Sequence, residues 1–140
     1  MNREIKFRGF CKEKNSWVYG MLSKIPKFGE TFRYVIVDVL RDEKDGEFNG
    51  LIFLNDEVEE DSISQYTGIN DMYKKEIYEK DIVYFNVAPS ERFKGSDWVY
   101  DQNGAVEIYK HFTLFGNWQS QYCCDIKITG NVFENPELLK

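Results

Sequence analysis

Residues 31–40 read TFRYVIVDVL, and this stretch decides the fold class. Its β-branched and aromatic residues suit the pleated, half-buried surface of a β-sheet. Apolar side chains fall on both faces of the strand that the stretch would form. Because a strand that is apolar on both faces is typical of the middle of a covered sheet, residues 31–40 predict a central strand that is buried on both sides.

Two further strands precede this stretch and form a predicted hairpin. Residues 3–10 alternate polar and apolar side chains, which is the two-residue period of a strand with one buried face. Lys6 and Arg8 would then lie on the solvated face. Residues 17–22 supply the second strand after a turn at residues 14–16.

The segments that follow contain turn signals and further short apolar runs. Residues 41–50 are charged and contain two glycines, so they predict an exposed loop, and residues 51–54 predict a short strand. Later strands are predicted at residues 82–87, 105–109, 112–118 and 125–133, with a long loop at 89–103. At the end, Asn135, Pro136 and Glu137 are suited to the N-cap and first turn of a short helical segment.

The sum of these elements is a mainly β fold made of two small β lobes that form one compact domain. A chain of 140 residues has the usual size of one domain. The acidic residues 56–61 are the expected border between an N-terminal lobe of residues 1–60 and a C-terminal lobe of residues 61–140. The second lobe is expected to be a partly closed, SH3-like barrel that ends in the short helical turn.

Charge and cysteine usage narrow the classes of partner. The formal net charge is −6, and residues 41–61 alone carry nine Asp and Glu against two Lys and Arg. An acidic chain opposes loose binding to DNA or RNA, because that binding depends on basic groups that displace counterions from phosphates.

The three cysteines are an odd number and two are adjacent, which favours reduced thiols in a reducing compartment. No apolar run reaches the roughly 18 residues of a membrane span, so no membrane association is expected.

Three segments together resemble the YopX family of phage and prophage proteins. They are residues 3–8 (REIKFR); residues 65–68 (QYTG) with Asp71, residues 76–79 (EIYE) and 81–83 (DIV); and residues 130–139 (GNVFENPELL). Their order, and their placement at the beginning, middle and end, make the match specific across the whole chain. The chain departs from the family in having Gly9-Phe10 where an Ala-Trp pair is usual, and in having Lys74 and Lys80 where glycines are usual. Lysine is poorer than glycine at positive φ, so these two turns are the places where the geometry of relatives need not hold.

The resemblance implies a β-rich fold, an origin in a phage or prophage and a molecular role that is not established, and it supplies no catalytic residues. With the reduced thiols, this origin leads us to expect a location in the host cytoplasm. Its middle segment provides the candidate partner-binding residues, which are Gln65, Tyr66, Asp71, Glu76, Glu79 and Asp81. The same side chains could instead cap turns and satisfy backbone donors, and this structural role is the one that the pattern favours.

A nucleic-acid site is the first alternative. The N-terminal hairpin interleaves basic and aromatic residues, as β surfaces that bind single strands do; the candidates are Lys6, Arg8, Lys12, Lys14 and Trp17. The other interpretation is that Lys6 and Arg8 form the solvated face of an ordinary edge strand, and the net negative charge favours it.

A small hydrolase is the second alternative. His111 is the only histidine and could act as a base for Cys11, Cys123 or Cys124, but sequence alone does not place it beside any of them. There is no Cys-x-x-Cys pair for zinc, no calcium-loop pattern and no glycine-rich phosphate loop, so no metal and no cofactor are expected.

Together these observations predict a non-catalytic protein-interaction module, an accessory protein of a phage or prophage that contacts a host or phage protein. Exposed strand edges on so aromatic a chain also predict a homo-oligomer.

Overall fold

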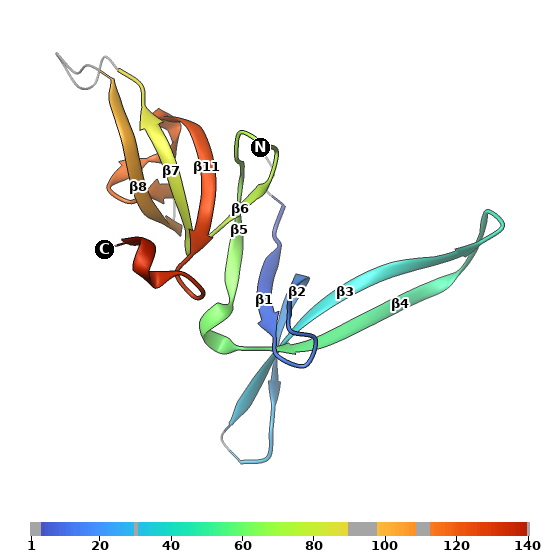
Figure 1. The fold of residues 1–140 in the computed structure, drawn as a ribbon. Coiled ribbons are helices and arrows are strands. Elements are labelled where there is room, and N and C mark those ends of the chain that lie inside the picture. Colours follow the sequence, from blue (N-terminus) through green and yellow to red (C-terminus); the bar gives the residue numbers. More distant parts are fainter. Residues whose placement is uncertain (1–3, 30, 90–97, 109–112, 140) are drawn as a thin grey trace. The chain divides into compact units, whose positions relative to one another are not determined.

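The structure is a computed structural model that describes residues 4–29, 31–89, 98–108 and 113–139, and it is mainly β (Figure 1). The earlier strands are β1 (Phe7–Cys11), β2 (Ser16–Pro26), β3 (Phe32–Lys44), β4 (Glu47–Val58) and β5 (Ser64–Asn70). The later strands are β6 (Glu76–Tyr78), β7 (Asp81–Val87), β8 (Val99–Ile108), β9 (Thr113–Phe115), β10 (Trp118–Gln119) and β11 (Cys123–Asn131). Single 3₁₀ turns are η1 (Glu60–Ser62), η2 (Ser120–Tyr122) and η3 (Pro136–Leu139). The mainly β fold class predicted from the sequence is confirmed.

The chain forms two compact units, Glu4–Gln65 and a second that begins at Tyr66. The predicted single domain with lobes of residues 1–60 and 61–140 stays a prediction. In the part of the chain that the structure describes, no helix is long and apolar enough to cross a membrane.

The first unit is an antiparallel sheet in the order β4-β3-β2-β1, with the start of β5 beside β1. β2 changes partner along its length: its first half pairs with β1 up to Gly20, and its second half pairs with β3 from Met21 onward. A Cβ atom on Gly20 would overlap the carbonyl oxygen of Val37 and lie 2.9 Å from its carbonyl carbon. Glycine is therefore required where β3 passes close to β2.

The core of the first unit is small. Cys11, Ile36 and Val58 are its buried centre, and partly buried residues such as Phe7 and Val18 pack around them. Val58 also lies directly over Gly9, where a Cβ atom would meet the Val58 side chain at 2.7 Å. Because only a few side chains are buried, this unit has little apolar burial to support distant parts of its sheet.

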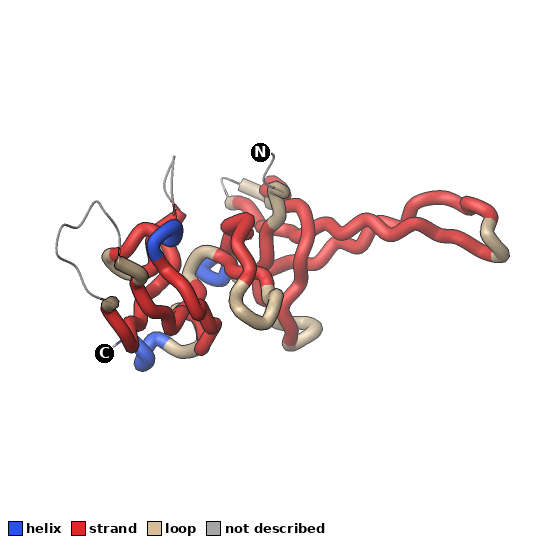
Figure 2. The backbone as a smooth tube through the Cα atoms, turned by 90° about the horizontal axis from the view of Figure 1, so that it is seen from above, coloured by secondary structure: helices blue, strands red, loops and turns tan. Residues whose placement is uncertain are grey.

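Two predictions about the first unit are wrong. Residues 41–50 were expected to be a loop, but β3 and β4 continue through them to a two-residue turn at Asp45-Gly46 (Figure 2). Both turn residues have positive φ, 54° and 80°, which suits the turn type that closes tight hairpins. Residues 31–40 were expected to be covered on both faces, but within β3 only Val35 and Ile36 are buried.

The second unit contains a five-stranded sheet in the order β10-β9-β8-β7-β11. It also contains the pair that the end of β5 forms with β6. Its core contains Ile77, Val83, Phe85, Val106 and Phe115, each essentially inaccessible to solvent. Among the described residues β10 and β11 are not paired, so the sheet is not closed into a complete barrel.

Three local predictions in the second unit have different outcomes. The loop predicted at residues 89–103 is too long, because β8 already begins at Val99 and pairs with β7; residues 90–97 lie outside the described chain. The register of β11 against β7 shifts between Ile128 and Gly130, at the predicted bend. The C-terminal helical turn is confirmed as η3.

Candidate functional site

The predicted binding motif folds back on itself, beginning with Asp71. Its buried carboxylate accepts backbone N–H groups from Tyr73 and Lys75 through Oδ1, both at 2.9 Å, and from Ile128 through Oδ2 at 3.4 Å. Asp71 therefore closes the turn between β5 and β6 and holds it against β11. This is the turn-capping role that aspartate commonly has.

Tyr66, Glu76 and Asp81 form a second set of internal contacts around Tyr78. The Tyr78 hydroxyl donates to Glu76 Oε2 at 2.8 Å, and the rings of Tyr66 and Tyr78 lie 5.6 Å apart. Asp81 is buried, and its Oδ2 accepts the Tyr78 N–H at 2.8 Å. The structure thus brings these three candidates together, and each of them contacts Tyr78 in its own segment.

The two remaining candidates of the motif are less buried. Gln65 is half-buried and pairs with Phe7, and it belongs to the first compact unit. Glu79 is also half-buried. Partner binding by the six residues stays a prediction, while four of them have an identified structural task.

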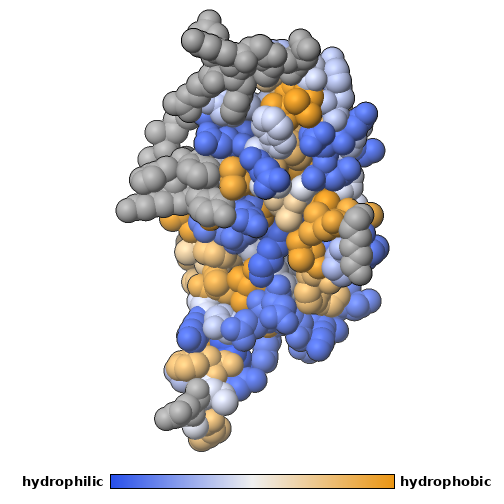
Figure 3. Space-filling model, turned by 90° about the vertical axis from the view of Figure 1, so that its left-hand side faces the viewer, coloured by the Kyte–Doolittle hydropathy of each residue, from blue (hydrophilic) through white to orange (hydrophobic). Residues whose placement is uncertain are grey.

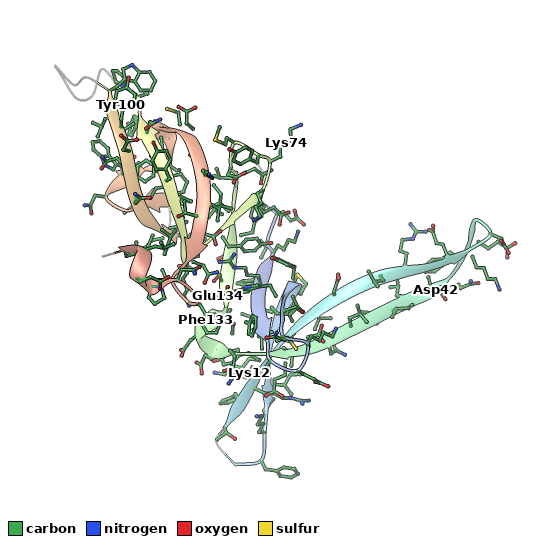
Figure 4. All side chains as sticks on the ribbon, viewed as in Figure 1. Lys12, Asp42, Lys74, Tyr100, Phe133 and Glu134 are labelled. Atoms are coloured by element: carbon green, nitrogen blue, oxygen red, sulfur yellow. The ribbon has the colours of Figure 1, made fainter. Side chains whose placement is uncertain are left out.

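Lys74 and Lys80 adopt the left-handed backbone conformation, with φ of 65° and 67°. Figure 4 shows Lys74 at the turn between β5 and β6. Both lysines therefore accept a geometry that glycine adopts without a steric penalty. At both positions where the sequence departs from the family pattern, the backbone of this chain has positive φ.

Replacing Lys74 with glycine is expected to raise the free energy of unfolding by about 0.5–1 kcal/mol, because it removes the Cβ penalty at positive φ. Lys75→Gly is the matched control, because Lys75 is exposed and has no positive φ; it is expected to destabilise. Chemical denaturation of both variants beside the parent chain measures the difference. Equal losses for the two lysines would show that the turn gains nothing from glycine.

The basic hairpin differs from the predicted solvated face. Arg8 is buried, and its guanidinium lies 4.6 Å from the centre of the Trp17 ring. The prediction of a solvated edge strand is wrong for Arg8 because β1 is an inner strand with β2 on one side and β5 on the other. A buried guanidinium stacked on an aromatic ring is well suited to a structural cation–π contact.

Two lysines of the hairpin are paired with acidic residues of the same unit. Lys12 Nζ lies 3.2 Å from Glu59 Oε1, and Lys14 Nζ lies 2.9 Å from Asp56 Oδ1. The hydrogen bond from Lys14 to Asp56 raises the pKa of that ammonium group. Lys6 is half-buried. A nucleic-acid phosphate would have to compete with these carboxylates for the two lysines.

The thiols have poor properties for nucleophilic catalysis. Burial, with the neighbouring Cys124 as a smaller cause, raises the pKa of Cys123 to about 12, and burial also raises the pKa of Cys124. Because their pKa values are raised, both cysteines are protonated at neutral pH. The thiolate is the reactive form of cysteine, so both thiols are poor nucleophiles. All three cysteines are free thiols, and Cys11 is buried in the core.

The remaining chemical candidates have no assembled site in the described part of the chain. His111, the proposed base, lies outside the described residues. Within them, no group of three or more His, Cys, Asp and Glu side chains could hold a metal ion.

The feature that the sequence did not predict is the distal part of the β3–β4 hairpin, residues 38–55, which we call the arm (Figure 1). None of its residues is buried, and Gly50 alone is partly covered. Asp42, labelled in Figure 4, marks its outer part. An isolated two-stranded hairpin is marginally stable in water, so an arm of this length would be stabilised by contact with another molecule.

Seven large apolar side chains of the arm are between 37% and 58% exposed: Val39, Leu40, Phe48, Leu51, Ile52, Phe53 and Leu54. Directly paired residues point to the same face of an antiparallel ribbon. Val39 with Phe53 therefore lies on one face, and Leu40 with Ile52 on the other. The face drawn in Figure 3 shows a different pattern from that of the arm. Its hydrophobic residues form small groups that hydrophilic residues interrupt, which is ordinary for protein surfaces.

A shallow groove of about 430 Å³ lies where the arm leaves the sheet. Tyr19, Met21 and Val39 line it, and each is exposed. The groove continues the apolar surface of the arm onto β2, so a molecule that covers the arm can also contact the body of the unit.

Comparison with known proteins identifies the fold and the family. None of the curated proteins compared with the chain matches it. The chain is similar to the crystal structure of protein EF1440 from Enterococcus faecalis, with a TM-score of 0.57 and 20% sequence identity. The alignment covers 99% of this chain and 100% of that one, which shows a shared fold. The family model described as YopX protein matches residues 6–140. The chain therefore belongs to the YopX protein family.

Proposed function

We propose that this chain is a non-catalytic protein-interaction module of phage or prophage origin, with the arm as the element that contacts a host or phage protein. The observation that carries the proposal is a two-stranded ribbon that is apolar on both faces and has no buried residue. Exposed apolar surface of this size is typical of interaction sites. The small core of the same unit gives the arm no support of its own.

The two alternatives have weaker support. Nucleic-acid binding would use Lys12 and Lys14, which are paired with carboxylates, and Arg8, which is buried against Trp17. A cysteine hydrolase would need a reactive thiol, but burial raises the pKa of both Cys123 and Cys124. Neither alternative explains the exposed apolar arm.

The proposal is tested by affinity capture and cross-linking from lysate of a phage-infected host, with the full chain as bait. The double variant Leu51→Lys/Phe53→Lys is expected to lose a captured protein whose cross-links map to the arm, because it places two charges on one apolar face. Met72→Lys/Tyr73→Lys is the matched control: it removes two exposed apolar side chains from the second unit and adds the same charge. Capture that survives in the arm variant, or that maps elsewhere on the chain, would contradict the proposal.

A further inference from the structure

The two edges of the arm differ in charge. Along β3, five of the seven residues from 38 to 44 are charged, in the sequence DVLRDEK. Along β4, the eight residues from 48 to 55, FNGLIFLN, contain no charged side chain. β4 is the last strand of its sheet, and no strand in the described parts of the chain pairs with its outer edge.

An open strand edge presents unpaired N–H and C=O groups that can pair with another strand. Proteins that stay monomeric usually protect such edges with charged side chains, proline or a bulge. The edge of β3 in the arm is protected against such pairing by the charged side chains of residues 38–44. The β4 stretch has no charge and no proline, and its one irregularity against β3 lies at its start, between Phe48 and Gly50, so that residues 51–55 continue in regular register. The stretch is rich in residues that favour strands, which is the composition of a segment that pairs with copies of itself.

We propose that a second copy of this chain pairs with the outer edge of β4, antiparallel and about a two-fold axis near Leu51 and Ile52. The two arms then form a four-stranded ribbon in the order β3-β4-β4-β3. A partner rich in charge would find no complementary group along residues 48–55, whereas the same stretch from a second copy places only uncharged residues opposite uncharged ones. A two-fold axis also closes the assembly at two chains.

The contact in a dimer of this kind is made at the strand edges. Backbone N–H and C=O groups along the outer edge of β4 pair with those of the second copy, and β4 side chains near the axis lie beside their counterparts on the adjacent strand. Pairing through the backbone leaves both faces of the ribbon open, so the dimer is compatible with a further protein bound to those faces.

This inference rests on the proposed function in one respect, that the arm is the binding element, and it names one partner of that element. The experiment is sedimentation velocity of the full chain over a wide dilution series, with a reducing agent present because the three thiols are free. A monomer–dimer equilibrium is expected. It requires no host or phage protein, so a failure to capture such a protein leaves this result unaffected.

Ile52→Lys and Leu40→Lys are a matched pair of variants, because these residues pair directly, share a face and have similar exposure, 46% and 44%. In the proposed dimer the two Ile52 side chains lie near the two-fold axis on adjacent strands. The two Leu40 side chains are three strand spacings apart, about 14 Å, beyond the screening length at physiological salt. Ile52→Lys is expected to raise the dimer dissociation constant by at least about tenfold and Leu40→Lys by less than about threefold, since like charges facing each other across strands destabilise pairing.

Hydrogen exchange of the unsubstituted chain provides a second measurement that does not depend on how the variants fold. Amides of residues 48–55 are expected to gain protection as the protein concentration rises, while amides of residues 38–44 do not. Three results would overturn the proposal: a monomer at every concentration, equal effects of the two lysine variants, which would indicate pairing through a face, or assembly that continues beyond the dimer.

Discussion

Replacing Gly20 with alanine is expected to destabilise the unit Glu4–Gln65 by about 2–4 kcal/mol. The new Cβ atom would overlap the carbonyl oxygen of Val37 and lie 3.3 Å from the amide nitrogen of Asp38. These are backbone atoms of β3, so no side-chain rotation can relieve the contact. The strand has to move away from β2 at the place where the arm begins.

Gly50→Ala is the control for this prediction. Gly50 has a similar backbone conformation, with φ of 142° beside 157° for Gly20, but no atom lies within 4 Å of the position that its Cβ would take. The expected loss for Gly50→Ala is below about 1 kcal/mol, because only backbone strain remains. Denaturant unfolding gives the two values, and hydrogen exchange locates the loss in the β2–β3 pairs. Similar losses for both glycines would show that strain at positive φ, and not contact with Val37, requires Gly20.

Much of the fold could be predicted because its causes are local. The alternation in residues 3–10 predicts a strand, of which the second half is confirmed by β1 (Phe7–Cys11), and Asn135, Pro136 and Glu137 predict the final 3₁₀ turn. Only part of the signal for the arm is present in the sequence: Asp45-Gly46 is a strong turn signal for a short hairpin, but residues 41–44 and Glu47 beside it are charged. Those charges favour a loop, which is why the sequence does not predict the arm.

The apolar pattern of β3 explains the error about its burial. Apolar residues on both faces indicate that a strand is covered, but they do not indicate whether the covering molecule is the same chain. Val35 and Ile36 are covered within the chain, whereas Val39 and Leu40, a few residues further, are exposed. The prediction of a doubly covered strand fails for the single chain, and the proposed partner protein, bound to the faces of the arm, is what would cover the rest.

The candidate binding residues show a different limit of sequence reasoning. A carboxylate that caps a turn and one that binds a partner have the same residue type and similar neighbours in sequence. Their difference is the direction of the oxygen atoms, which depends on contacts far along the chain: Asp71 is held partly by Ile128. Arg8 is a similar case, because its burial follows from the position of β1 between β2 and β5.

Replacing Asp71 with alanine is expected to destabilise the second unit by about 3 kcal/mol, because three backbone donors lose their acceptor. The N–H groups of Tyr73 and Lys75 lose Oδ1, and the N–H group of Ile128 loses Oδ2. The turn between β5 and β6 then loses its closure and its contact with β11. Denaturant unfolding measures the loss, and hydrogen exchange at these three amides shows whether it arises at the turn.

Asp71→Asn separates the two halves of this role. The amide keeps one oxygen, which can still accept from Tyr73 and Lys75, but it places an NH₂ group opposite the N–H of Ile128, where two donors face each other. The expected loss is therefore intermediate, about 1–2 kcal/mol, with the amide of Ile128 affected more than those of the turn. If Asp71→Ala is instead as stable as the parent chain, the carboxylate does not hold the turn, and its place in the motif is better explained by a bound partner. The two substitutions thus decide between the structural and the binding interpretation at the residue where the contacts are most completely defined.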